Sequence, residues 1–136
     1  MSLALLALAA FASIGNVQVD VGRADWAAFP ELRRGSRELP VAAMISRVET
    51  ILRERQCQLA GQDHQRFDIT VPYLVLVEPD GSTERVVVAD MGCPALETFV
   101  GSLVAALAAE GNFRPTGESQ ARWYGSNFNF NLRTSH

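Results

Sequence analysis

Residues 66 to 90, "RFDITVPYLVLVEPDGSTERVVVAD", predict a β-hairpin at the centre of the fold. Alternate residues from Phe67 to Val77 are apolar or aromatic, the period-two pattern of a strand with one buried face. The stretch "EPDGS" supplies Pro, Asp and Gly for a chain reversal, and a β-branched run over 84–89 predicts the second strand. Pro72 cannot donate a ladder hydrogen bond, so we expect an edge or a bulge at that point.

A predicted helix lies on either side of this hairpin. The first begins at Pro40, which suits a first helical turn, and ends near Arg55; its apolar stripe consists of Val41, Met44, Ile45, Val48, Ile51 and Leu52. The second begins at Pro94 and ends at residues 110 and 111; its stripe consists of Leu96, Phe99, Val100, Leu103, Val104 and Leu107. Both helices therefore have one face to bury against a sheet.

The stretch "NFNFNL" at 127–132 predicts the last strand. Period two turns Phe128, Phe130 and Leu132 to the helices, and it turns Asn127, Asn129 and Asn131 to water. The expected fold class is α+β: a small antiparallel three-stranded sheet, in the order helix, strand, strand, helix, strand, packed on two helices. Such a sheet has two exposed edges, and unpaired edge groups are both an aggregation hazard and a docking site.

The segment before residue 40 is expected to lie outside this domain, which we place at 40–136. Residues 1–14, "MSLALLALAAFASI", are uncharged and mostly Leu and Ala, so we expect a signal peptide over 1–12, with a start further upstream left open because no basic segment precedes it. The alternatives are a buried N-terminal helix or a retained membrane attachment. Residues 13–39 are expected to form an arm, in which the valines at 17, 19 and 21 allow a short strand and Trp26 and Phe29 pack on the domain.

Composition excludes several function classes. The chain has 136 residues and a formal net charge of -3, which predicts no nucleic-acid binding. All twelve basic residues are arginine, so lysine-dependent phosphate loops and Schiff-base chemistry are absent.

The two cysteines, Cys57 and Cys93, fit an exported protein. In an oxidising compartment a lone pair predicts a structural disulfide, which the chain-entropy argument values at roughly 3 to 4 kcal/mol. The alternative is two unpaired buried thiols.

The sequence predicts no active site. Cys57, Asp63 and His64 are close enough in sequence to permit a thiol nucleophile or part of a metal site, but a single histidine in a polar loop is more often solvated. No phosphate-loop, dinucleotide, nucleophile-elbow or zinc-protease motif occurs. We therefore expect no catalytic residue, metal, cofactor or small-molecule substrate.

Residues 66 to 132 resemble the C-terminal domain of the TonB family. The landmarks are the Asp-Gly turn at 80–81, the small-residue connection "MGCP" at 91–94, Leu96 near the helix start, the "FRP" unit at 113–115 after the helix, and the final alternating strand. The helix at 40–55 matches the family pattern less specifically. The resemblance implies a periplasmic domain that adds an extended segment of an outer-membrane transporter to its last strand, here Asn127, Phe128, Asn129, Phe130, Asn131 and Leu132. The spanning anchor, the Pro-rich linker and a tyrosine-proline motif before the first helix are not found in this sequence.

The resulting expectation is a non-catalytic periplasmic binding module, linked by the resemblance to TonB-dependent transport. Its partner would be an envelope or outer-membrane protein segment. Three alternatives remain open. The edge of the last strand is capped by the chain's own arm; or the chain is a structural homodimer formed by sheet-edge pairing; or it is a small thiol- or metal-dependent enzyme that uses Cys57, Cys93 and His64.

Overall fold

A computed structural model describes residues 13–14, 17–35, 39–111, 113 and 117–133. The predicted signal peptide lies outside these residues. Within them the elements are, in chain order, β1 (Ser13–Ile14), β2 (Val17–Gly22), the short 3₁₀ helix η1 (Trp26–Ala28), α2 (Val41–Arg53), β3 (Arg66–Val77), β4 (Thr83–Ala89), α3 (Pro94–Ala109) and β5 (Arg122–Arg133).

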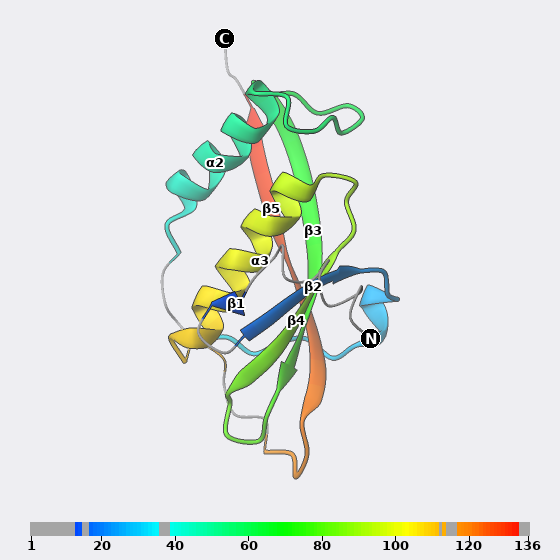
Figure 1. Cartoon of the computed structure of the whole chain (residues 1–136), viewed down its shortest axis with the longest axis vertical. Coiled ribbons are helices and arrows are strands. Elements are labelled where there is room, and N and C mark those ends of the chain that lie inside the picture. The colour runs from blue at the N-terminus through cyan, green and yellow to red at the C-terminus, as the bar shows by residue number, and fades with distance from the viewer. Residues whose placement is uncertain (1–12, 15–16, 36–38, 112, 114–116, 134–136) are drawn as a thin grey trace.

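The described strands form one mixed sheet in the order β1-β2-β4-β3-β5 (Figure 1). Strand β4 pairs antiparallel with β3, and β3 pairs antiparallel with β5, as the hairpin and the final strand predict. The prediction of three antiparallel strands is wrong, because β2 pairs in parallel with β4 from Gln18 to Gly22. The α+β class and the positions of the two helices and three predicted strands are confirmed.

The twelve residues of β3 pair without a register shift with the twelve of β5. The ladder between β3 and β4 is shorter and begins at Tyr73 opposite Val88. Pro72 is therefore the first residue beyond that ladder, where its missing N–H costs no inter-strand hydrogen bond. Before this point β3 and β5 continue as a two-stranded ribbon.

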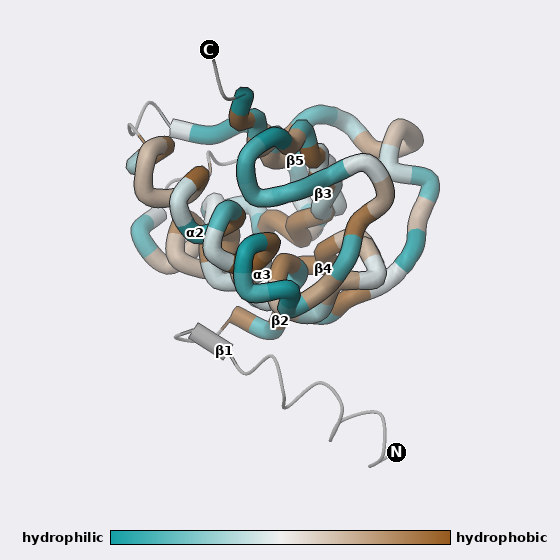
Figure 2. Tube along the Cα trace, turned by 90° about the horizontal axis from the view of Figure 1, so that it is seen from above, coloured by the Kyte–Doolittle hydropathy of each residue, from teal (hydrophilic) through white to brown (hydrophobic). Residues whose placement is uncertain are grey.

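Helices α2 and α3 cover one face of the sheet (Figure 1). The core lies between these layers, and Figure 2 shows hydrophobic residues gathered there. Val71, Val75 and Val77 of β3, Val86 of β4 and Val100 of α3 are wholly buried. The alternating strand residues and the helical stripes therefore meet as their periods predict.

A disulfide between Cys57 and Cys93 joins the loop after α2 to the start of α3. Its Cα atoms are 5.3 Å apart and 36 residues apart in sequence. Beside it, the buried Glu97 carboxylate accepts hydrogen bonds from the backbone N–H groups of Met91 and Cys93, at 2.6 and 3.2 Å. A carboxylate at this position satisfies amide groups at the amino end of α3 and fixes the turn that presents Cys93.

Strand β2 fits against α3 through a close approach at Gly101. A Cβ atom added at Gly101 would lie 2.6 Å from Cγ1 of Val19. Val19 belongs to β2, which was expected as a short strand in the arm but not as part of the sheet. Its contact with Gly101 fixes how α3 lies over the parallel pair.

Replacing Gly101 with alanine should destabilise the protein by about 1 to 3 kcal/mol, because the added methyl group must displace Val19. Urea unfolding at neutral pH measures the change. The control is Ser102→Ala, at the exposed next position of α3, which should stay within about 0.5 kcal/mol of the natural protein. An equal effect of both substitutions would contradict the packing of β2 on α3.

Candidate functional site

The outer edge of β5 is the candidate site, because among the described strands β5 has β3 on one side and none on the other. At Gly125 the N–H donates to Pro30 O and the C=O accepts from Leu32 N–H, both at 2.8 Å, so this residue presents its backbone groups away from β3. Successive residues of an antiparallel strand alternate in this direction. Asn127, Asn129 and Asn131 therefore also present their N–H and C=O groups to the outer edge.

An independent hydrogen bond confirms this assignment. Asp68 of β3 lies opposite Asn131, and its N–H donates to Oε1 of Gln62 at 2.7 Å rather than to β5. Two directly opposed residues share the same direction, inward to each other or both outward. Since Asp68 faces away from β5, Asn131 faces away from β3.

The opposite edge of the two-stranded ribbon is blocked. The outward N–H of Asp68 donates to the Gln62 side chain, and Pro72 has no N–H. Among the outward positions of this part of β3, only Thr70 has an N–H that no described residue binds. A docking strand finds almost no donors there, whereas each outward asparagine of β5 offers one donor and one acceptor.

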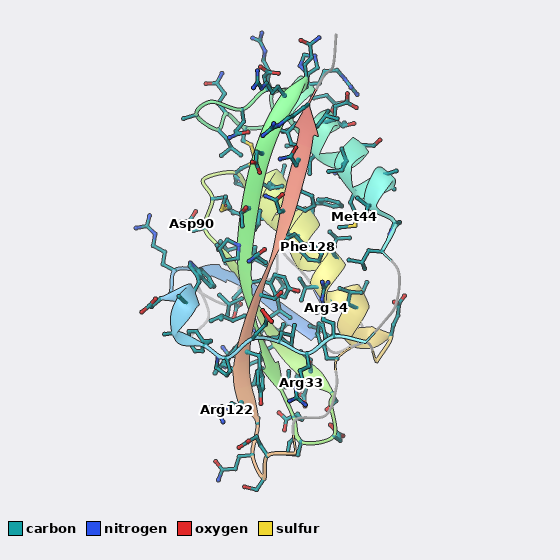
Figure 3. All side chains as sticks on the ribbon, turned by 180° about the vertical axis from the view of Figure 1, so that it is seen from behind. Arg33, Arg34, Met44, Asp90, Arg122 and Phe128 are labelled. Atoms are coloured by element: carbon teal, nitrogen blue, oxygen red, sulfur yellow. A yellow bond between two sulfur atoms is a disulfide. The ribbon has the colours of Figure 1, made fainter. Side chains whose placement is uncertain are left out.

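The segment before α2 blocks the β5 edge at Gly125. It passes over the sheet face opposite the helices and crosses β5 at Gly125 (Figure 3). A Cβ atom at Gly125 would lie 3.4 Å from Trp26 O and 3.6 Å from Phe29 Cβ. Trp26 and Phe29 are half-buried here, as expected for an arm packed on the domain. Capping of the last strand's edge by the arm was one of the expected alternatives, and it occurs at Gly125. The position of the crossing was not predicted, although an isolated glycine inside a strand is the usual signal of close backbone approach.

The six residues predicted to bind a partner divide into two groups. Asn127, Asn129 and Asn131 are exposed on the face of the ribbon away from the helices, and Nδ2 of Asn129 donates to Asp68 Oδ1 at 2.9 Å and to Thr70 Oγ1 at 2.8 Å. The others, Phe128, Phe130 and Leu132, face the helices, and the two phenylalanines are buried. Backbone groups, the asparagine side chains and part of the half-buried Leu132 are therefore accessible.

Aromatic packing fixes the strand from its inner side. The ring of Phe128 stacks on Tyr73 at 5.3 Å between centroids and on Phe130 at 6.0 Å. The guanidinium of Arg34 lies 5.9 Å from the Phe128 centroid, on the α2 side of β5 (Figure 3). The edge is thus part of a rigid element, which reduces the entropy lost when a partner pairs with it.

The residues of the thiol or metal alternative lie together but in a different place. Cys57, Asp63 and His64 line a broad hollow of about 860 Å³ beside the loop after α2. Both cysteine sulfurs are used in the disulfide, and Asp63 accepts N–H bonds from Gln65 and Arg66 within its own turn. Among the described residues no group of three or more His, Cys, Asp or Glu side chains could hold a metal ion.

Comparison with known proteins gives no relative: no protein-family model, no curated protein and no solved structure matches this chain.

Burial raises the pKa of the Tyr73 hydroxyl, and the Ser126 hydroxyl and the Arg34 guanidinium offset part of the rise. Because the folded state favours the neutral hydroxyl, its contribution to the free energy of unfolding is fully present below the unfolded-state pKa of about 10. This contribution is lost as the pH rises through the higher pKa of the folded state. The natural protein should therefore lose stability above pH 10, while Tyr73→Phe should lose less. Urea unfolding at pH 7 and pH 11 measures this difference; equal losses in the two proteins would contradict it.

Proposed function

We propose that this chain is a non-catalytic periplasmic binding module, similar in role to the TonB C-terminal domain, that binds an extended segment of an envelope or outer-membrane protein. Binding occurs by strand addition to β5. The observation that supports this proposal is the row of outward backbone groups at Asn127, Asn129 and Asn131, for which no described residue outside the sheet provides a backbone partner. A link to TonB-dependent transport follows from the resemblance alone.

The chemistry of this edge suits an extended peptide. Each new backbone hydrogen bond contributes about 0.5 to 1.5 kcal/mol net, so several together give useful affinity without any side chain of defined sequence. Pairing cannot continue past Gly125, because its backbone N–H and C=O are already hydrogen-bonded to Pro30 and Leu32. The segment between Gly125 and the end of β5 therefore sets the length of the partner strand.

The disulfide is compatible with a periplasmic or extracellular location, where such bonds persist. Within the described residues, no helix is both long enough and apolar enough to cross a membrane. The thiol-enzyme alternative would first require reduction of the Cys57–Cys93 bond, because both sulfurs are joined in it.

Replacing Asn129 with proline should abolish binding and leave the fold intact. The substitution removes an N–H that points away from β3, and proline is tolerated at such edge positions. A photo-crosslinking amino acid at the exposed position 131, introduced in a Gram-negative periplasm, should attach to an extended segment of one envelope protein, identified by mass spectrometry. The adduct should be lost in Asn129→Pro.

The matched control is Asn129→Ala, which removes the side-chain bonds to Asp68 and Thr70 but keeps the backbone donor, and should retain the adduct. A crosslinker at exposed Glu84 in β4 controls for proximity. An adduct unaffected by proline would contradict strand addition. An adduct of twice the chain's mass would instead favour the homodimer, since the same free edge can pair with a second copy.

Export predicts a defined covalent state. Protein recovered from the periplasm, alkylated without reduction, should have an intact mass that lacks residues 1–12, lacks two hydrogens and contains no alkyl group. Alkylation after reduction provides the control, because both cysteines should then be modified. A full-length product with two alkylated thiols before reduction would contradict the periplasmic location and reopen the thiol-enzyme alternative.

A further inference from the structure

A small apolar hollow lies beside the β5 edge, on the side that faces the helices. Its volume is about 130 Å³. It is lined by Leu39 and Pro40 just before α2, Met44 of α2, Leu103, Ala106 and Leu107 of α3, Glu110 at the end of α3, and Phe128 of β5. In Figure 3 both Met44 and Phe128 lie on the α2 side of β5. The hollow therefore adjoins the stretch of edge where a partner strand would pair.

Sheet geometry determines which partner residue would reach this hollow. A docked strand continues the pleat of β5, so the residue opposite Phe128 points to the same face as Phe128. Directly opposed side chains have Cβ atoms about 4.5 to 5.5 Å apart. The partner side chain at this position must lie against Phe128, beside the hollow, whereas its two neighbours point to the polar face with Asn127 and Asn129.

The size of the hollow matches one apolar side chain. An apolar protein cavity of about 150 Å³ is known to hold benzene, so a volume near 130 Å³ is suited to a leucine, isoleucine or phenylalanine side chain. Most of its lining atoms come from aliphatic or aromatic groups, against which a polar side chain would lose hydrogen bonds to water. The hollow therefore favours an apolar occupant.

A second copy of the chain does not supply that occupant through its own β5. In β5-to-β5 pairing, the side chains that face the helices would be Phe128, Phe130 and Leu132 of the second copy. The two phenylalanines are 5% and 1% exposed within their own core, and Leu132 is half-buried against that core. To fill a neighbour's hollow, each of these side chains would have to give up contacts with its own core. An extended segment of another protein has side chains free on both faces, so it can fill the hollow without that loss.

We propose that the hollow is a specificity pocket, which receives one leucine, isoleucine or phenylalanine side chain of the docked segment, at the position opposite Phe128. This inference depends on the proposed strand addition. It adds the chemical class of the partner segment: an extended sequence with one obligatory apolar residue between two residues that face the polar side of the sheet.

The test uses a phage-displayed library of random nonapeptides, selected on the full chain and on three variants. Ala106→Leu fills the hollow from α3, where leucine is a good helix former, and its fold is checked by its thermal unfolding midpoint. Ala109→Leu is the matched control, because position 109 is exposed on the same helix and does not line the hollow. Asn129→Pro tests strand addition itself.

On the natural chain and on Ala109→Leu, one peptide position should be enriched in Leu, Ile or Phe. Changing that residue to alanine in a synthetic peptide should raise Kd on the order of tenfold on the natural chain and less than about twofold on Ala106→Leu. Selection on Ala106→Leu should yield small residues at that position, and Asn129→Pro should yield no enriched sequence.

Two results would overturn the inference separately from the proposed function. In the first, the selected peptides no longer bind Asn129→Pro, but no position in them is enriched in apolar residues. In the second, the preference for an apolar residue is the same on Ala106→Leu as on the natural chain. A library that gives no enriched peptide on the natural chain, or peptides unaffected by Asn129→Pro, would overturn strand addition and the pocket together.

Discussion

The ladder between β3 and β5 is the constraint on which the rest of the structure depends. It joins two twelve-residue strands, but β4 supports only the half that begins at Tyr73. The other half is a two-stranded ribbon, and such a ribbon is marginally stable in water unless one face is packed. Helix α2 and the stacked rings of Phe128 and Phe130 provide that packing. The disulfide then joins the loop after α2 to the start of α3, so the two covering helices are held relative to each other.

A long ribbon creates unpaired backbone edges, and most of these edges are closed by local devices. Pro72 lacks a donor, Gln62 binds the outward N–H of Asp68, and the segment at residues 30–32 closes Gly125. Exposed edges are usually blocked in this way because they promote aggregation. The stretch from Asn127 to Asn131 has no comparable device among the described residues. This contrast along one ribbon supports a binding role for the stretch.

Local periodicity explains why so much of the framework could be predicted. Alternation placed Phe128 and Phe130 inward and the asparagines outward, and the helical stripes placed Val48 and Val100 in the core. The predicted sheet did not include β2, although the alternating valines indicated a short strand. The reason is that parallel pairing with β4 joins segments more than sixty residues apart. No signal within residues 17–22 specifies that partner. The same difficulty applied to the arm, whose path over Gly125 depends on the finished sheet.

The sequence by itself determined the element types, the buried faces and the pair of cysteines, because these follow from side-chain period and composition within short windows. Tertiary structure decided the parallel strand, the crossing at Gly125, the open stretch of β5 and the hollow beside Phe128. Each of these depends on contacts between segments distant in the chain. Whether a strand edge is open or closed depends on the segments packed beside it, and these cannot be identified from the residues of the strand itself.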